Sequence, residues 1–397
     1  MDYSLGQAAA ELRAELRGLL DEHVPVGYLS PFSRDPEAAK VSTRVIEELS
    51  RRGLLTLAWP MRYGGREADT WQQTVLREEM WAYYEPRGNH YLGLNWVGPA
   101  IMEFGTEDQR AEHLPGIANG TYTWCQGFSE PEAGTDLASL RTYAVRDDHG
   151  DWSVNGQKVW TSYAPMANWC MCAVRTDREA PARDGISLFM LPMDSPGLEV
   201  REIDSMLGHM HLNELFLEEV PATDAMILGG VNKGWHVIRY ALVLERVGIA
   251  RYARSDRLLV QLRHHLGRRY EDLPEGLRSR LARATVHNRI ARLLSYKAIG
   301  SQAAGRVDDV EAAAARVATI AAEQEVADLL MEAAGGEALN GNSAASPPLG
   351  GALEDFWRYT SASTVASGSI DVQRMHIARA ALGNAGEARV AEEKSRA

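Results

Sequence analysis

A stretch from Gln126 to Asp136 concentrates residue types that can bind a ligand. Pro131 and Gly134 interrupt regular structure there, while a serine, a threonine and several acids supply short polar side chains. Such a composition predicts a stiff loop rich in hydrogen-bonding groups. A loop of this kind can hold the polar edge of a small molecule.

A second stretch, Val154 to Ser162, has the pattern of a strand that ends in Trp160 beside two hydroxyl groups. A planar ligand stacked on Trp160 would present its polar edge to hydroxyls from both stretches, namely Ser129, Thr135 and Ser162. Taken singly, Trp160 is equally well explained as a core aromatic residue and Thr135 as part of a turn cap. The residues indicate a binding site only as a set.

Glu245 is the most informative charged residue, because it interrupts an apolar run that begins at Val237. On a helix, its neighbours three and four residues away are all apolar: Ala241, Leu242, Gly248 and Ile249. A carboxyl group buried without a positive partner has a raised pKa, as a base working near neutrality requires. A structural ion pair, for example with Arg246, explains these residues equally well.

The composition bounds the class of protein. With 397 residues, the chain is long enough for two or three domains. Its 45% hydrophobic and 24% charged residues are ordinary for a soluble globular protein. A net charge of −12 argues against nucleic acid as the main partner. An anionic small ligand stays possible, because a local basic patch can outweigh a distant acidic surface.

The cysteines and the N-terminus bear on location. Cys125, Cys170 and Cys172 lack zinc-type spacing, and an odd count without a disulfide framework favours a reducing cytoplasm. Acidic residues interrupt the leucines of the first helical pattern, which argues against a secretory signal. No window reaches the roughly 20 apolar residues of a membrane span. We therefore expect a soluble cytoplasmic protein without a membrane partner.

The periodicity predicts three parts: a helical domain over residues 1–119, a strand-rich domain over 120–230 and a helical domain over 231–397. Thr106 is the predicted N-cap of a helix, with Gln109 three residues later. The Asn155-Gly156 pair predicts a tight turn. Short alternating segments predict strands of a small β-barrel or sandwich at 143–146, 152–155, 169–174, 186–192 and 213–220. The predicted helices include 41–52, 71–84, 108–118, 236–265, 276–304, 310–334, 354–362 and 370–382.

Several motifs together resemble the acyl-CoA dehydrogenase family. They are the two stretches described above, the turn Pro60-x-x-x-Gly64-Gly65 and the helix entry Gly105-Thr106-x-x-Gln109. The resemblance implies an α+β fold: an N-terminal helical domain, a central β-barrel domain and a C-terminal helical bundle. It also implies an FAD-dependent oxidoreductase of lipid metabolism that acts on an acyl-CoA substrate, with electron-transfer flavoprotein as electron acceptor. Such enzymes move a proton from the α carbon to a base and a hydride from the β carbon to flavin N5.

The resemblance carries flavin-binding roles over to particular residues. Gln126, Phe128 and Ser129 match positions that line the flavin ring, as do Trp160 and Ser162. Ser129 and Ser162 each replace a commoner threonine, so both hydroxyl groups are kept. Thr135 belongs to the same loop. Ser369 matches the threonine of a C-terminal loop that reaches the phosphate side of the cofactor.

The resemblance also bears on the base. Most members carry a catalytic Glu in a C-terminal "E-G-T" loop, but in this chain Ser367 stands at that position. A second group, which includes the isovaleryl and long-chain enzymes, carries Glu on the helix after the β domain in an "L-E-R" context. Leu244-Glu245-Arg246 matches that context, so Glu245 is the predicted base. Asp371 is the weaker candidate.

Two departures suggest that the cofactor site is shared with another chain. The Arg-x-x-Phe-Gly motif of homotetrameric members is missing from 267–276; Arg263 to Gly267 arrives early, with Leu for Phe. The "Q-x-x-G-G" signature appears as Glu332-Ala333-Ala334-Gly335-Gly336. This pattern resembles actinobacterial heterotetrameric acyl-CoA dehydrogenases, including steroid side-chain enzymes. It predicts the base-bearing half of a heterotetramer; a homo-oligomer is the alternative.

Glycines at 93, 98 and 248 suggest room for a bulky or branched acyl chain. Three other functions fit the same residues. One is a flavin-dependent oxidase or monooxygenase of the same fold, and another is a dehydrogenase acting on an acyl group held by a carrier protein. The third is a non-catalytic partner subunit, against which the presence of both Glu245 and Trp160 argues.

Overall fold

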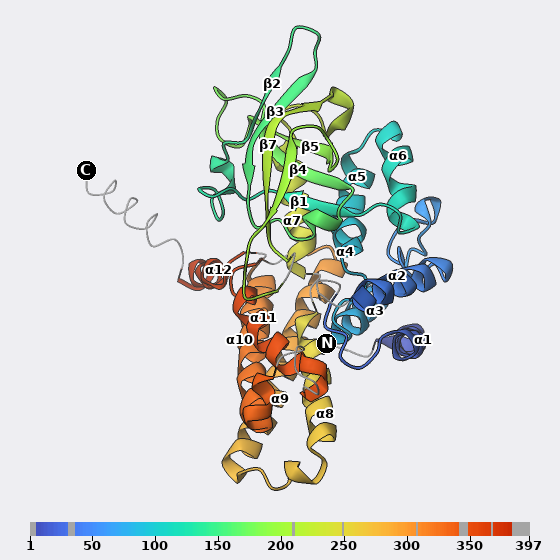
Figure 1. Cartoon of the computed structure of the whole chain (residues 1–397), viewed down its shortest axis with the longest axis vertical. Helices are drawn as coiled ribbons and strands as arrows, with labels where there is room; N and C mark the ends of the chain where they lie inside the picture. Colours follow the sequence, from blue (N-terminus) through green and yellow to red (C-terminus); the bar gives the residue numbers. More distant parts are fainter. Residues whose placement is uncertain are drawn as a thin grey trace, which may run out of the picture. The chain divides into compact units, whose positions relative to one another are not determined.

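The structure is a computed structural model that describes residues 5–30, 36–208, 211–247, 250–306, 309–340, 348–366 and 368–382. Contacts divide it into two compact units, one spanning Leu5–Ile249 and the other beginning at Ala250 (Figure 1). The first unit therefore contains the N-terminal helices, every strand and the helix that carries Glu245.

The N-terminal helices form because their apolar residues recur at helical spacing, and α3 (Thr70–Ala82) and α6 (Glu107–Ala118) also begin with a capping box. Leu12, Leu16, Leu19 and Leu20 lie on the buried face of the first helix. Thr106 and Gln109 make the predicted capping box, which is confirmed. These helices are α1 (Gly6–His23), α2 (Pro36–Arg51), α3 (Thr70–Ala82), α4 (His90–Leu92), α5 (Gly98–Phe104) and α6 (Glu107–Ala118). A π-helical segment, η2 (Gly93–Val97), joins α4 to α5.

The middle of the chain forms one eight-stranded sheet with the order β6-β7-β3-β2-β4-β5-β8, and β1 pairs with β4 in parallel. The strands are β1 (Trp124–Gly127), β2 (Tyr143–Arg146), β3 (Trp152–Lys158), β4 (Trp169–Arg175), β5 (Ile186–Pro192), β6 (Leu198–Glu202), β7 (Asn213–Ala222) and β8 (Ile227–Leu228). The predicted bounds of β2 and β5 are confirmed.

The expected closed β-barrel is wrong, because this strand order is open. The physical reason lies in the central strands, whose two faces pack into different cores. Met171 on β4 and Leu188 on β5 belong to a core shared with the N-terminal helices and with α7 (Gly234–Val247). Cys172 and Phe189, their neighbours along the strands, belong to the core on the sheet's other face. Helices cover the first face, whereas the core on the other face is built mainly by the strands themselves: Trp152 on β3 packs edge-on against Phe189 on β5, with ring centroids 6.0 Å apart. The sheet therefore curves over this core without closing into a barrel.

The predicted tight turn at Asn155-Gly156 is also wrong. Both residues lie inside β3, where the pairing with β7 shifts register between Val154 and Gly156. Gly156 has a φ of 148°, and a Cβ atom there would lie 2.5 Å from the Thr142 hydroxyl. The register shift is a β-bulge whose extra residue lies on β7, because β7 takes three steps from Val220 to Leu217 while β3 takes two, and Glu219 there has a left-handed φ of 51°. Gly156 allows the close approach to Thr142, so the Asn-Gly pair does not make a hairpin turn.

The second unit is helical. The predicted helix 236–265 is two helices, because α7 ends at Val247 in the first unit and α8 begins at Arg251. Residues 248 and 249, which include Gly248, lie outside the described ranges. The helices of the second unit are α8 (Arg251–Leu266), α9 (Glu275–Ala303), α10 (Asp309–Ala334), α11 (Ala352–Ser363) and α12 (Ile370–Leu382). Their core holds a fully buried carboxylate, Glu323, with Arg254 at 3.3 Å.

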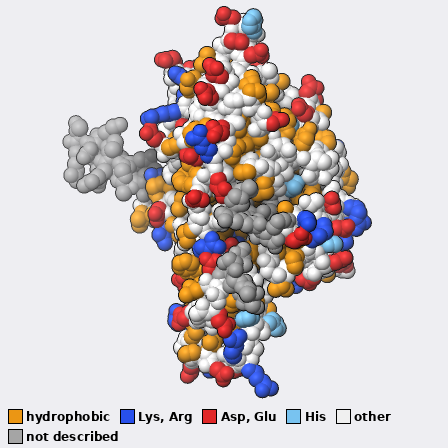
Figure 2. All heavy atoms as spheres, in the orientation of Figure 1, with side chains coloured by type: hydrophobic (Ala, Val, Ile, Leu, Met, Phe, Trp, Pro, Cys, Tyr) orange, Lys and Arg blue, Asp and Glu red, His pale blue; other side chains and the backbone are white. Residues whose placement is uncertain are grey.

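Short 3-10 helices connect these elements. They are η1 (Met61–Tyr63), η3 (Leu137–Ser139), η4 (Ala164–Met166), η5 (Asp224–Met226), η6 (Gly267–Tyr270), η7 (Gly335–Leu339) and η8 (Pro348–Gly351). On the face shown in Figure 2, acidic and basic side chains are interspersed. No helix within the described ranges has both the length and the apolar character needed to cross a bilayer.

The turn from Pro60 to Gly65 generates a prediction about stability. A Cβ atom added at Gly65 would overlap the carbonyl oxygen of Trp59, which is backbone and can yield only if the turn shifts. We expect Gly65→Ala to lower the free energy of unfolding by about 1–3 kcal/mol, measured by urea denaturation.

The matched control is Gly18→Ala. Gly18 lies exposed in α1 with nothing within 4 Å of an added Cβ. Alanine there should raise the free energy of unfolding by up to about 1 kcal/mol, because it favours the helix. Equal effects of the two substitutions would contradict the close approach at Gly65.

Candidate active site

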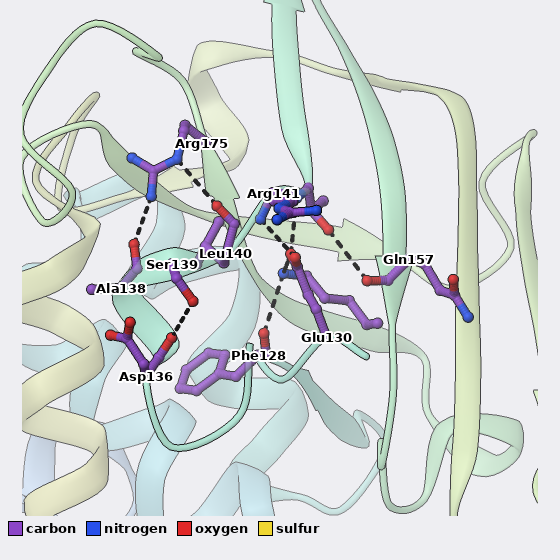
Figure 3. Close-up of polar contacts among 11 residues, drawn as sticks. Phe128, Glu130, Asp136, Ala138, Ser139, Leu140, Arg141, Gln157 and Arg175 are labelled. Atoms are coloured by element: carbon purple, nitrogen blue, oxygen red, sulfur yellow. Dashed lines mark hydrogen bonds and ion pairs between the residues drawn. The ribbon is translucent and has the colours of Figure 1, made fainter. Parts of the chain in front are cut away.

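The loop after β1 is held in shape by its own backbone, as its composition predicts. Glu130 and Ala133 exchange two backbone hydrogen bonds of 3.0 and 3.1 Å, which close the turn around Pro131. Further along, the Ser139 hydroxyl donates to the Asp136 carbonyl oxygen at 2.7 Å, as Figure 3 shows. The guanidinium group of Arg175 on β4 donates to the carbonyl oxygens of Ala138 at 2.8 Å and Leu140 at 3.2 Å. The loop is therefore fixed to the sheet at both ends.

A buried ion pair joins this loop to β3. The ammonium nitrogen of Lys158 lies 2.8 Å from Glu130 Oε1 and 3.2 Å from the Phe128 carbonyl oxygen. Lys158 is fully buried and Glu130 is 7% exposed. The Glu130 carboxylate also accepts hydrogen bonds from the backbone N–H groups of Arg141 at 2.6 Å and Thr142 at 2.8 Å (Figure 3). Three donors thus satisfy one carboxylate beneath the loop.

These contacts control the charge of Glu130. Burial tends to raise the pKa of the carboxyl group, but the Lys158 charge and the hydrogen bonds outweigh it and lower the pKa. The folded state therefore favours the ionised form. Because both groups are buried, water cannot replace either partner if they separate. The pair therefore holds the loop in one position relative to β3.

Trp160 lies two residues after Lys158 and is exposed to solvent. Val159 N–H donates to the Ser129 carbonyl oxygen at 2.9 Å, and Thr161 N–H donates to the Asn213 carbonyl oxygen at 2.9 Å. Between these two buried residues, Trp160 has a left-handed φ of 61° and is 57% exposed. A bulky residue held in that conformation is strained, and strain of this kind clusters at functional sites.

The predicted flavin residues in the first unit fall on connected backbone. Ser129 is bonded through its carbonyl group to the residue before Trp160, and Ser162 follows two residues after it. Both side chains are half-buried, as is Gln126, whereas Phe128 is buried. The structure therefore brings the backbone of Ser129, Trp160 and Ser162 together just beyond the C-terminal end of β3.

The remaining predicted cofactor residues are placed differently. Thr135 is exposed in the loop, one residue before the segment that Ser139 fastens. Ser369 belongs to the second unit, where its hydroxyl accepts a hydrogen bond from Val372 N–H at 3.4 Å at the start of α12. Neither position tests the cofactor role, which stays a prediction. Ser367 lies outside the described ranges.

Glu245 lies on α7, in the same unit as the flavin segment. The described residues include its backbone but not its side chain. A close approach fixes the start of this helix, because a Cβ atom on Gly234 would lie 2.6 Å from the backbone nitrogen of Leu188 on β5. The helix also packs against η2. Of the four apolar neighbours expected around Glu245, Ala241 is buried and Leu242 half-buried, while Gly248 and Ile249 lie outside the described ranges, so the core-like face stays a prediction.

The exposed surface beyond the end of β3 fits the ring of a flavin. The Trp160 indole is exposed and available for stacking, and the half-buried Ser129 and Ser162 lie on backbone connected to it. The buried Thr161 hydroxyl has no hydrogen-bond partner among the described residues, as expected of a polar atom that awaits one from a ligand or water. Ser129, Trp160 and Ser162 would hold such a ring.

The sequence interpretation missed Lys158 and Glu130. A signal for Lys158 existed, since the alternation of β3 puts it on the buried face with Trp152 and Val154. A lysine on that face requires an acidic partner. Glu130 lies 28 residues earlier, however, and only the folded loop brings it there.

Three family models match the chain. The acyl-CoA dehydrogenase N-terminal domain matches residues 7–121, the middle domain residues 125–220 and the C-terminal domain residues 232–382. The chain belongs to the acyl-CoA dehydrogenase family. As a member of this family, it is an FAD-dependent oxidoreductase, and its helix–sheet–helix order is the acyl-CoA dehydrogenase fold.

Individual proteins resemble this acyl-CoA dehydrogenase over nearly its whole length. Acyl-CoA dehydrogenase IpdE1 of Mycolicibacterium smegmatis is 30% identical over 94% of this chain and 97% of its own. The ChsE4-ChsE5 complex from Mycobacterium tuberculosis contains a chain with a TM-score of 0.85 and 31% identity, covering 96% of this chain and 99% of that one. The Tcur3481-Tcur3483 steroid ACAD gives a TM-score of 0.86 and 30% identity, covering 96% and 98%.

In this acyl-CoA dehydrogenase, the acid of the altered C-terminal signature has a partner. Glu332 on α10 lies 2.9 Å from the Arg280 guanidinium on α9, so its charge is partly offset. Asp371, the weaker base candidate, is exposed and lies 3.2 Å from Arg374. Its carboxylate is therefore open to solvent and already paired with an arginine one turn along its own helix.

The buried pair beneath the loop yields a second prediction. Replacing Lys158 by Met leaves the Glu130 carboxylate buried without its cation, so the free energy of unfolding should fall by about 3–5 kcal/mol. The control is Glu132→Gln, which removes an exposed ion pair with Arg141 and should change stability by less than about 1 kcal/mol. Urea denaturation of both variants measures the difference.

The pH dependence of Glu130→Gln checks the same contact. The lowered pKa of Glu130 contributes stability above the ordinary value of 4.5, and this contribution is lost as pH falls through the folded pKa. The stability gap between wild type and this variant should therefore shrink below pH 4.5. A gap that widens in acid would contradict the assignment.

Proposed function

We propose that this chain catalyses the α,β-dehydrogenation of an acyl-CoA thioester to the 2,3-enoyl-CoA, with Glu245 as the base. The observation that carries the proposal is the placement of Glu245 on α7, within the unit that also displays Trp160 and its flanking hydroxyls. Family membership supports the reaction class. The "L-E-R" context of Glu245 and the Ser at position 367 support the choice of base.

Each residue has a separate task in this proposal. Glu245 takes the proton from the α carbon, and Trp160 stacks on the cofactor while Ser129 and Ser162 bind its polar edge. Gln126, Phe128 and Thr135 complete the wall of the ring site, and Ser369 contributes toward the phosphate side. When bound, FAD supplies the hydride acceptor at N5. Electron-transfer flavoprotein is the proposed electron acceptor.

We further propose that the chain works as the base-bearing half of a heterotetramer in the cytoplasm. The missing Arg-x-x-Phe-Gly motif and the Glu332 substitution support a partner chain that supplies the adenine and pyrophosphate contacts. Two similar structures carry the names of two chains, and one of them is titled a steroid ACAD. The proposed substrate therefore has a bulky or branched acyl chain. Three unpaired cysteines suit a reducing compartment.

The proposal includes three segments, 1–119, 120–230 and 231–397, close to the spans of the three family models. A carrier-protein thioester in place of CoA, or oxygen as electron acceptor, would use the same base and ring site. An anaerobic assay with acyl-CoA separates these cases, because a monooxygenase requires oxygen and external reductant.

Glu245→Gln tests the base. Because general-base catalysis contributes about 10²–10⁴-fold, the rate of flavin bleaching by acyl-CoA should fall by that factor while flavin content stays the same. Stopped-flow absorbance of the reduced flavin measures it. The matched control, Asp371→Asn, should bleach at the wild-type rate. Wild-type bleaching by the Glu245 variant would overturn the assignment.

Co-expression tests the assembly. We expect the chain produced with a matching second acyl-CoA dehydrogenase-like subunit to purify as a heterotetramer with one flavin per pair of chains. Native mass spectrometry and flavin absorbance measure both quantities. A homotetramer of this chain alone with one flavin per chain would show that the site is complete without a partner.

A further inference from the structure

The connection between α11 and α12 in the second unit carries Ser369, the residue proposed to contribute toward the phosphate side of FAD. Helix α11 ends at Ser363 and α12 begins at Ile370. Of the residues between them, the structure describes 364–366, 368 and 369. A connection without fixed contacts would have to be ordered when the cofactor binds, which opposes binding because ordering lowers conformational entropy. The contacts that hold this connection therefore bear on cofactor affinity.

A buried arginine of a neighbouring helix holds the first half of the connection. Arg316 lies on α10 and is 8% exposed. Its Nη2 atom donates hydrogen bonds to the carbonyl oxygen of Ser363, at 3.3 Å, and to that of Ala366. The last carbonyl groups of a helix have no partner within the helix, so a guanidinium group that binds there fixes the path of the chain just after α11.

A second buried arginine reaches the same point from α8. Arg251 is 3% exposed, and its Nη1 atom donates to the Ser363 hydroxyl at 2.8 Å. Its guanidinium carbon also lies 5.2 Å from the centre of the Tyr359 ring on α11. Ser363 is therefore bound through its hydroxyl group from one helix and through its carbonyl group from another.

A buried carboxylate, Glu323 on α10, supplies negative charge beside the arginines of α8. It is fully buried and lies 3.3 Å from Arg254 and 3.9 Å from Arg251. Taking a guanidinium group out of water is unfavourable unless a charge or hydrogen bonds replace the water. Arg254 pairs with this carboxylate, whereas Arg251 and Arg316 direct hydrogen bonds to the end of α11.

Backbone hydrogen bonds extend this constraint to Ser369. The Ile370 N–H group donates to the Thr364 carbonyl oxygen at 2.9 Å, which closes the connection across its width. Ser369 then begins α12, since its carbonyl oxygen accepts from Gln373 N–H at 3.2 Å and its hydroxyl from Val372 N–H at 3.4 Å. The position of Ser369 is thus coupled to the point that the two arginines hold.

We propose that Arg316 and Arg251 are positioning residues for the cofactor. They hold the connection so that Ser369 already occupies its binding position before FAD arrives. Neither arginine touches the cofactor in this proposal. The inference rests on the proposed function, which gives Ser369 its role, and the physical effect is preorganisation: the ordering that would oppose binding is completed when the protein folds.

The test is a titration of the flavin-free protein with FAD, with the partner subunit present where flavin loading requires one. Arg316→Met removes the hydrogen-bond donor and keeps a long side chain. The dissociation constant of FAD, measured by flavin fluorescence, should rise by about 10-fold or more. Arg316→Lys keeps a charged donor and should restore most of the affinity. Arg251→Met should weaken FAD binding in the same direction.

The matched control is Arg254→Lys. Arg254 is as deeply buried as Arg251, at 4% exposed, but it pairs with Glu323. Lysine keeps a cation beside that carboxylate, so this variant should lose stability in urea and keep the wild-type dissociation constant of FAD. A second readout separates positioning from chemistry: at saturating FAD, the rate of flavin bleaching by acyl-CoA in Arg316→Met should match that of wild type.

The outcomes separate the inference from the function on which it rests. Lowered stability of Arg316→Met with wild-type FAD affinity would show that the arginine only caps α11, and would overturn the inference. If Arg316→Met does not fold, an unchanged dissociation constant of FAD in Arg251→Met overturns it equally. Failure of every acyl-CoA to bleach the flavin of the wild-type protein would overturn the proposed function instead.

Discussion

The buried contact between Lys158 and Glu130 is the constraint on which the ring site depends. It joins the loop after β1 to the end of β3, two residues before Trp160. Because both groups are removed from water, the contact is stable only if the loop and the strand keep one geometry. With the loop and strand in this geometry, Val159 bonds to Ser129 and Thr161 bonds to Asn213. The Trp160 side chain between them is left exposed to solvent. A charge pair that no ligand needs to touch thus controls the surface to which a ligand would bind.

The same unit also positions the helix of the proposed base. Gly234 lets α7 begin in contact with β5, a central strand of the sheet, and the π-helical segment packs against the helix. Proton and hydride transfer require that base and cofactor stay in register to within a fraction of an ångström. Holding both on elements that share one buried core satisfies this requirement, since interiors are close-packed and deform little.

The second unit carries the departures from the homotetrameric pattern. Glu332 stands where the resemblance to homotetrameric members predicts a glutamine, and Arg280 lies beside it. An acid engaged by an arginine of its own chain is poorly suited to bind a phosphate group of a cofactor. The division of labour proposed for this protein follows: one chain supplies base and ring site, and another supplies the contacts at the far end of the cofactor.

The sequence by itself determined whatever depends on local periodicity and capping. The bounds of β2, β5 and α12 and the capping box at Thr106 were predictable, because each depends on residues within a few positions of one another. Family motifs likewise led to the prediction of Glu245 as the base and of the flavin segment, and both roles stay predictions. Only the tertiary structure decided the open sheet, the β-bulge of β7 opposite Asn155 and the partner of Lys158. These depend on contacts between residues far apart in the chain, and a linear pattern does not specify which distant groups meet or which polar atoms remain without a partner.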